Sequence, residues 1–224
     1  MPKTSSPASF VLIKRRDRNY PPRLNDLYDP PACIYTLGNI DLLQAPMIAI
    51  VGSRLASREG LKNAAVISRN LSKAGLLVVS GLARGIDGIA HEAALSSGPN
   101  HFTMAVCGTG LDVIYPKEHL GLARSIGQKG ILISEYPPGT PPKSSHFPRR
   151  NRIIAALALG VVVIEAAERS GSIITARLAT DLGREVFAVP GSIQSPLSSG
   201  CNLLIQQGAK LVRKPDDILE ELIF

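Results

Sequence analysis

Six short apolar runs, separated by amphipathic stretches, follow one another from Met47 onward, and this alternation constrains the fold most strongly. The runs cover residues 47–51, 76–79, 103–107, 131–134, 161–165 and 186–189. They are continuous rather than alternating, which is typical of strands that helices cover on both faces. Strands that alternate with helices form right-handed βαβ units. The sequence therefore predicts an α/β fold with a doubly wound, mostly parallel sheet and helices on both faces.

The amphipathic stretches between these runs have the periodicity of helices packed on a sheet. We expect the helices at residues 57–74, 86–96, 116–128, 150–159, 173–182 and 201–207. The chain then closes with a predicted strand at 210–212 and a helix near 216–222. Pro215 and the two aspartates that follow it mark the start of that last helix.

The first 44 residues do not share this pattern. Two proline pairs, at 21–22 and 30–31, prevent a long helix, and only residues 33–37 have the character of a strand. The same segment carries a basic cluster made of Lys14, Arg15, Arg16 and Arg18. We interpret residues 1–44 as a proline-rich arm that packs on a core domain formed by residues 45–224.

Composition limits the cellular setting and the ligands. No apolar run approaches the ~18 residues that span a bilayer, and the N-terminus lacks the apolar segment of a signal peptide. We therefore expect a cytoplasmic protein without a membrane partner. The three cysteines and four histidines are scattered, which predicts reduced thiols and no metal site. The net charge of +7 makes an anionic partner plausible.

Glycine or serine follows nearly every predicted strand. In doubly wound sheets, ligands bind beyond the carboxyl ends of the strands, where glycine lets the backbone approach and helix N-termini attract anions. The first such loop is Gly52-Ser53-Arg54, which offers a turn, a hydroxyl donor and a guanidinium fork for phosphate. An ordinary turn with a surface arginine is the alternative. The loop is not GxGxxG, so no dinucleotide cofactor is expected.

Two further loops follow the same scheme. Residues 80–87, SGLARGID, contain two glycines four apart that can form an anion nest, with Arg84 as a candidate phosphate ligand and Asp87 as a helix cap. His91 lies one turn later, where we expect a structural pair with Asp87. Residues 170–172, Ser-Gly-Ser, open another helix, either as a phosphate cradle or as a plain N-cap.

The most basic segment is 143–152, which holds four cations and no acidic residue. Phe147 stands among them in a proline-bounded loop. Single-strand recognition needs both features, because cations neutralise the backbone and an aromatic face stacks on a base. A solvated basic loop and a core position for Phe147 are the alternatives. Arg152 begins an apolar helix, and we expect it at the helix N-terminus, facing the ligand edge.

Together these blocks resemble the DNA-processing protein A family, also called DprA or Smf. The agreement runs in order from about residue 24 to residue 212. Its most specific parts are GSR at 52–54, SGLARGID at 80–87, FPRRNRIIA at 147–155, SGSIITA at 170–176 and SSGCNLLIQQGA at 198–209. The resemblance implies an extended Rossmann fold without enzymatic activity. It also implies a homodimer that binds and protects incoming single-stranded DNA and loads RecA recombinase during natural transformation.

The resemblance also implies roles for individual residues. Arg54 and Lys143 would contact phosphates, and Phe147 would contact a base. The full candidate set is Gly52, Ser53, Arg54, Lys143, Phe147, Arg149, Arg150, Asn151, Arg152, Ser170 and Gly171. Many members also carry a helical N-terminal domain and a C-terminal winged helix. Because this chain starts near the arm and stops after Phe224, we expect neither of these domains here.

One enzymatic alternative shares the expected topology. Proteins that resemble cytokinin-riboside phosphoribohydrolases hydrolyse nucleoside monophosphates and supply a catalytic glutamate from a PGGxGTxxE loop. Residues 165–175 contain no such loop, and Glu165 ends a predicted strand. No pair of carboxylates at a strand end suggests general acid–base chemistry. A nucleotide-binding or nucleoside-monophosphate-hydrolysing protein remains the alternative.

Overall fold

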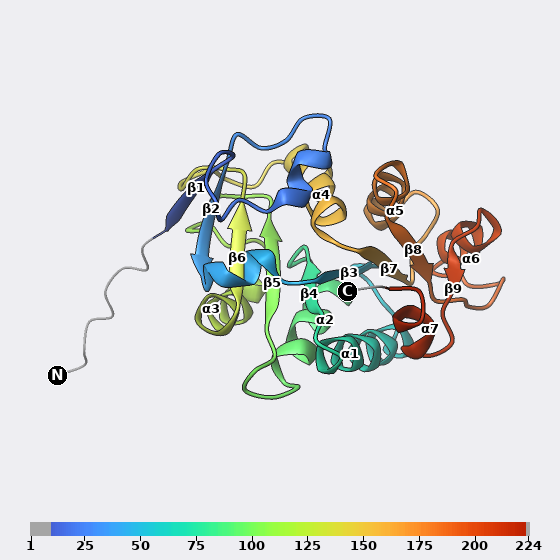
Figure 1. Ribbon diagram of the computed structural model, residues 1–224. Helices are drawn as coiled ribbons and strands as arrows, with labels where there is room; N and C mark the ends of the chain where they lie inside the picture. Colours follow the sequence, from blue (N-terminus) through green and yellow to red (C-terminus); the bar gives the residue numbers. More distant parts are fainter. Residues whose placement is uncertain (1–9, 223–224) are drawn as a thin grey trace.

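The computed structural model describes residues 10–222, which form a nine-stranded sheet in the order β1-β2-β6-β5-β4-β3-β7-β8-β9 (Figure 1). The six predicted strands of the core are all present and pair in parallel. They are β3 (Met47–Gly52), β4 (Leu77–Ser80), β5 (Thr103–Cys107), β6 (Ile131–Ser134), β7 (Gly160–Ile164) and β8 (Glu185–Ala188). The predicted α/β class with a doubly wound, mostly parallel sheet is confirmed.

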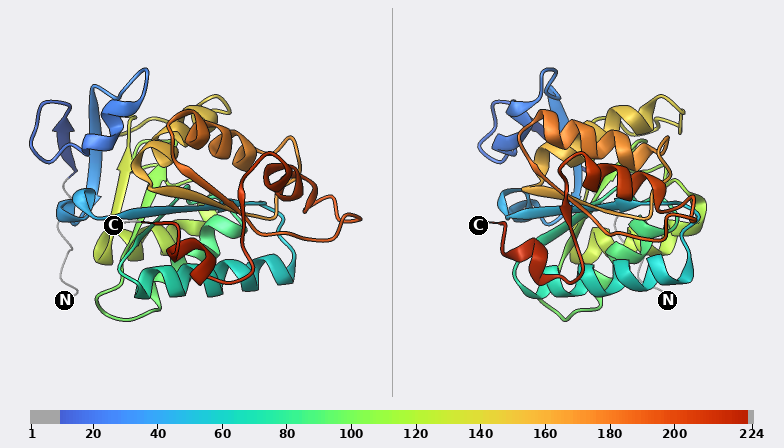
Figure 2. Two further views of the ribbon diagram at one scale, coloured as in Figure 1. Left: turned by 45° about the vertical axis from the view of Figure 1, so that its right-hand side comes forward. Right: turned by 90° about the vertical axis from the view of Figure 1, so that its right-hand side faces the viewer.

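Helices cover both faces of the sheet (Figure 2). One face holds α1 (Arg58–Lys73), α2 (Ile86–Leu95), α3 (Leu120–Lys129) and α7 (Asp216–Leu219). The other holds α4 (His146–Leu157), α5 (Gly171–Asp181) and α6 (Ser199–Gln206). Successive strand residues alternate between the two cores, so that Val79 faces α4 and its neighbour Val78 faces α1. This double burial explains why the strand runs are continuous in sequence.

The N-terminal segment extends the sheet. The strand predicted at 33–37 is β2 (Cys33–Gly38), which pairs antiparallel with β6 on one side and with β1 (Val11–Lys14) on the other. Strand β1 was not predicted, because Ile13 is the only buried residue among its four. Two short 3-10 helices, η1 (Pro22–Asp26) and η2 (Ile40–Gln44), complete the segment and agree with the absence of a long helix.

Several helix boundaries differ from the prediction. The helix expected at 116–128 is split into η3 (Lys117–His119) and α3. Helix α4 begins at His146, four residues before the predicted start at Arg150. Pro148 caused this error, because a proline in the first turn of a helix needs no N–H partner and does not end the helix. The closing elements are α7 and the short strand β9 (Lys210–Leu211).

The cysteines are unpaired thiols in different surroundings. Cys107 and Cys201 are buried, and burial raises the pKa of Cys107 to about 12 and that of Cys201 to about 11. Cys33 is only partly buried, at the start of β2. Within residues 10–222, no three His, Cys, Asp or Glu side chains gather as a metal site would require. The same residues contain no helix with the length and apolar character to cross a bilayer.

Candidate nucleic-acid interface

Loops from four separate parts of the chain enclose a cavity of about 760 Å³ at the carboxyl edge of the sheet. Its walls come from the loop after β3, the loop after β4, the start of α4 and the start of α5. Nine of the predicted site residues line it: Gly52, Ser53, Arg54, Lys143, Phe147, Arg150, Asn151, Ser170 and Gly171. The other two, Arg149 and Arg152, lie outside its lining. Topology alone therefore brings together motifs separated by more than a hundred positions.

The loop after β3 is held rigidly by its backbone. Gly52 is required there, because a Cβ at this position would lie 1.9 Å from the carbonyl oxygen of Ile164. The Ser53 N–H donates to the carbonyl oxygen of Glu165 at 2.6 Å, and the Ser53 carbonyl accepts from the Ile86 N–H at 3.2 Å. Arg54 projects from this fixed turn and is exposed.

Glu165 also fixes the far end of that loop. Its carboxylate accepts the Ser57 N–H at 2.8 Å and the Ser57 hydroxyl, and the Ser57 oxygen in turn accepts the Gly60 N–H as the N-cap of α1. Glu165 holds a left-handed φ of 51°, an unusual conformation for a non-glycine residue. Its importance was missed in the sequence, where it reads as the end of a strand; it lies just beyond β7.

Phe147 lies on the cavity wall in the first turn of α4 and is partly exposed, so the alternative of a core position does not hold. Its ring contacts Tyr115, with centroids 5.3 Å apart, and Arg54 lies over the ring at 5.8 Å. A cation over an aromatic face is favourable and orients both groups. Lys143 stands exposed just before the helix, and its carbonyl accepts the His146 N–H.

Two helix N-termini open at this cavity. Ser145 precedes α4 and Ser170 precedes α5, and neither makes a side-chain capping bond to its helix. The Ser170 hydroxyl instead contacts the Ser172 hydroxyl at 2.7 Å, so Ser172 is not the plain N-cap that its sequence position allowed. Uncapped first-turn N–H groups carry partial positive charge and attract anions. The cavity thus combines exposed cations with backbone donors at helix N-termini.

Arg150, a candidate site residue, is almost completely buried. It sits in the second turn of α4, only 4% exposed, and its Nη1 donates to the Val106 carbonyl at 2.6 Å. A Cβ on Gly81 would lie 1.9 Å from that Nη1, so a larger residue there would displace the Arg150 guanidinium. Burial lowers the pKa of Arg150, and the Asp87 carboxylate opposes this shift. Arg150 therefore contributes positive charge from beneath the cavity floor.

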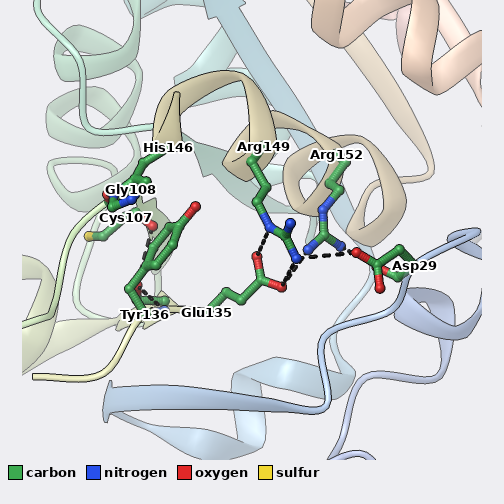
Figure 3. A network of polar contacts seen from close by, with 9 residues as sticks. Asp29, Cys107, Gly108, Glu135, Tyr136, His146, Arg149 and Arg152 are labelled. Atoms are coloured by element: carbon green, nitrogen blue, oxygen red, sulfur yellow. Dashed lines mark hydrogen bonds and ion pairs between the residues drawn. The ribbon is translucent and has the colours of Figure 1, made fainter. Parts of the chain in front are cut away.

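Arg149 and Arg152 form an ion network with acidic residues of other segments (Figure 3). Arg149 contacts Glu135, after β6, and Asp29, in the N-terminal segment, each at 3.2 Å. Arg152 contacts the same Glu135 and donates to the Asp29 carbonyl at 2.6 Å. The expectation that Arg152 lies at the helix N-terminus facing the ligand edge is wrong. Both arginines instead tie α4 to the N-terminal segment.

The loop after β4 also corrects two expectations. The Asp87 carboxylate accepts N–H groups of Gly81 and Ala83, so it stabilises the loop itself rather than capping α2. His91 does not pair with Asp87 but contacts Thr103 at 2.8 Å. Arg84 is engaged by Glu118 at the surface. The predicted Asp87–His91 pair and the predicted capping role of Asp87 are therefore both wrong.

A doubly wound sheet with a basic, aromatic-lined cavity beyond its strand ends defines a Rossmann-type protein whose candidate site suits anionic ligands. The sequence model of the DNA recombination-mediator protein A family matches residues 11–223, and the chain belongs to this family. It is 50% identical over 216 residues to DNA processing protein DprA of Streptococcus pneumoniae, which covers 96% of this chain and 74% of that protein. It is 47% identical over 214 residues to protein Smf of Escherichia coli, covering 95% of this chain and 57% of the relative.

Solved structures give the same assignment. The crystal structure of the pneumococcal protein has a TM-score of 0.92 at 49% identity, covering 96% of this chain and 75% of that chain. DNA processing protein A from Helicobacter pylori, whose structure is described for its single-stranded DNA binding mode, has a TM-score of 0.84 at 31% identity, with 94% of each chain covered. A molybdenum cofactor binding protein from Rippkaea orientalis, at 16% identity, TM-score 0.56, and 79% and 94% coverage, shares the fold alone.

Proposed function

We propose that this chain binds single-stranded DNA in the cavity at the carboxyl edge and acts as a non-enzymatic recombination mediator. The observation that carries the proposal is the arrangement of Phe147, whose partly exposed ring lies beside Arg54 on a cavity wall flanked by two uncapped helix N-termini. A base needs an aromatic face and a phosphate needs a cation or a backbone donor. The DNA-binding relative from Helicobacter pylori supports the same ligand class.

In this proposal, different residues of the cavity contact the phosphates and the bases of the strand. Arg54 and Lys143 are exposed cations that neutralise phosphates, and Phe147 stacks on a base. Gly171 and Asn151 lie at the start of α5 and on α4, where the Asn151 amide donates to the Gly171 carbonyl at 3.2 Å. This bond joins the second turn of α4 to the first residue of α5, so the two helices form one wall. Arg149 and Arg152 stay secondary in this proposal, because Glu135 and Asp29 already neutralise them.

The finer biological role follows the family. We propose that the bound strand is protected and passed to RecA recombinase, that the protein works as a cytoplasmic homodimer, and that the setting is natural transformation. The hydrolase alternative is weakened by the placement of Glu165, whose carboxylate is already occupied by Ser57. A general base has to reach a substrate proton, and this carboxylate faces the N-terminus of α1 instead.

Oligonucleotide binding at several salt concentrations tests the proposal. Arg54→Ala and Lys143→Ala should each weaken binding to an oligo(dT) and flatten the slope of log affinity against log salt by about 0.7, the contribution of one phosphate on a single strand. Phe147→Ala should cost about 1–3 kcal/mol with little change of slope. Arg69→Ala, an exposed cation at the far end of α1, is the matched control and should bind like the wild type.

Unchanged binding in a folded Arg54→Ala/Lys143→Ala double variant would contradict this site. Release of ribose phosphate from a nucleoside monophosphate would instead identify the protein as a nucleoside-monophosphate hydrolase. Circular dichroism of each variant establishes that it is folded before its affinity is compared.

A further inference from the structure

The turn after β1 displays a dense group of cations. Arg15, Arg16 and Arg18 follow Lys14 within five positions and are all exposed, and Asp17 is the one acidic residue among them. The Asp17 carboxylate accepts the backbone N–H of Lys14 at 2.8 Å. The acidic residue therefore shapes the turn while the basic side chains point outward. We call residues 14–18 the basic turn.

These cations lack acidic partners in the part of the chain that the structure describes. Of the arginines in the basic turn, Arg15 bonds the Asn25 amide oxygen, and none forms an ion pair with a carboxylate among residues 10–222. Arg149 and Arg152 differ sharply, because both are neutralised. Unneutralised, crowded cations repel one another, and a polyanion relieves that repulsion.

Strand pairing places the basic turn at the same edge of the sheet as the cavity. Strand β2 runs antiparallel to β6 and β1 runs antiparallel to β2, so β1 ends on the side where β6 ends. Lys14 lies opposite Cys33, which is two residues beyond the Tyr35–Ser134 pair at the end of β6. Figure 1 shows the loops that follow β1 at the end of the sheet where β5 and β6 point, close to α4.

The gap between the two sites is short. Phe147 packs on Gly108, directly after β5, and the order β5-β6-β2-β1 separates that position from the basic turn by three strand spacings. Three spacings amount to about 14 Å. The surface between them carries the network of Arg149, Arg152, Glu135 and Asp29, whose charges cancel. No net negative charge in that network repels a strand crossing from one site to the other.

We propose that the basic turn is a second phosphate-contacting site that extends the path of single-stranded DNA beyond the cavity, over the ends of β6 and β2. This inference rests on the proposed function, because it assigns the direction in which a strand bound at Phe147 continues. A strand that only fills the cavity does not reach the turn, whereas a longer strand contacts both. The basic turn then adds affinity only for longer ligands.

The test compares ~3-nucleotide and ~20-nucleotide oligo(dT) by fluorescence anisotropy over a range of salt concentrations, because three nucleotides are too short to bridge the gap of about 14 Å. Arg16→Ala/Arg18→Ala is the main variant, because neither side chain makes a hydrogen bond or ion pair within residues 10–222. We expect it to bind the longer strand about tenfold more weakly at ~0.1 M salt, with a slope shallower by about 1.4. The short strand should bind as to the wild type.

A matched pair controls for net charge. Arg69→Ala/Lys73→Ala removes two exposed cations from the end of α1 at the opposite edge of the sheet, and should leave both oligonucleotides unaffected. The charge-reversed Arg16→Glu/Arg18→Glu should weaken the longer strand further. Wild-type affinity and slope for the longer strand in a folded Arg16→Ala/Arg18→Ala variant would overturn the proposal, as would equal losses in the two variant pairs.

Failure of the proposed function has a different signature. If the cavity does not bind DNA, the short strand will show no dependence on Arg54 and Lys143 in the otherwise unaltered chain. If only the basic turn is wrongly assigned, binding of the short strand still depends on Arg54 and Lys143. The Arg16→Ala/Arg18→Ala variant then binds both strands as the wild type does.

Discussion

His91 shows how a single buried side chain is held in one protonation state. The Thr103 hydroxyl donates to the Val78 carbonyl at 2.6 Å, so its oxygen accepts from the His91 Nδ1–H. The other ring nitrogen, Nε2, is buried and meets no partner among residues 10–222. A proton on Nε2 would therefore be a buried, unpaired donor on a charged ring. Burial lowers the pKa of His91 to about 3.

Acid should destabilise the protein through this residue. The folded-state pKa lies below the ordinary value of 6.5, so the unfolded chain binds the proton first and stability is lost as the pH falls below about 6.5. The free energy of unfolding should fall by at most about 1.4 kcal/mol per pH unit, the value for one proton that only the unfolded chain binds. Urea unfolding of the wild type and of His91→Gln between pH ~7 and ~5 measures it. Because burial raises the pKa of Asp87, which acts in the opposite sense, the difference between the two proteins is the informative quantity. Parallel curves would contradict the assignment.

For single residues, the sequence predicts which ones belong to the site better than it predicts what surrounds each of them. Arg54 and Phe147 were identified as site residues from their neighbours in sequence, and both line the cavity. Arg150 was grouped with them because it stands in the same basic run, and it too borders the cavity, but from the interior and almost completely buried. A helix advances 100° per residue, so the neighbouring Arg149 and Arg150 point in different directions, one to the surface and the other to the interior.

Among the elements, the loop between β3 and α1 depends on β7 for its shape. Glu165 accepts from both Ser53 and Ser57 and so holds the segment that carries Arg54 at its two ends. The unfavourable φ of 51° persists because these bonds compensate for it. Sequence reasoning could not find this contact, since Glu165 and Ser57 are 108 positions apart and neither belongs to a recognisable pair.

Glu165→Ala should therefore weaken DNA binding without removing a cation from the site. We expect the free energy of unfolding to fall by about 2–3 kcal/mol, because a partly buried carboxylate that accepts two hydrogen bonds is lost. Oligo(dT) affinity should fall severalfold with an unchanged salt slope. Ser57→Ala is the matched variant, and a double-mutant cycle with Glu165→Ala should show strong coupling. A flatter slope of log affinity against log salt would instead show that Glu165→Ala removes phosphate contacts.

For the whole molecule, the cavity selects the form of nucleic acid. A base reaches Phe147 only after leaving its stack, whereas a duplex offers its phosphates alone. The net charge of +7 gives a salt-dependent affinity for any polyanion. Single-stranded DNA should bind at least about fivefold more tightly than duplex at ~0.15 M salt, since stacking on one base contributes about 1–3 kcal/mol. Competition anisotropy measures the ratio, which Phe147→Ala should reduce. Equal affinities for the two forms would contradict stacking at Phe147.

The overall architecture was the most predictable level. Continuous apolar strands and intervening helices are dictated by double burial, and every one of the six core strands follows from them. The N-terminal segment could not be assigned in the same way. Strand β1 has a single buried residue, and it is held mainly by backbone bonds to β2, which leave little trace in the pattern of side chains.

The placement of Cys33 makes the native chain suitable for site-selective labelling. Cys107 and Cys201 are buried, and burial keeps their thiols protonated, so a maleimide dye reacts at the partly exposed Cys33. In register, Cys33 faces Lys14 at the start of the basic turn. A fluorophore attached there sits at the border of the second phosphate-contacting site and becomes an optical reporter of a strand's arrival, with no introduced cysteine.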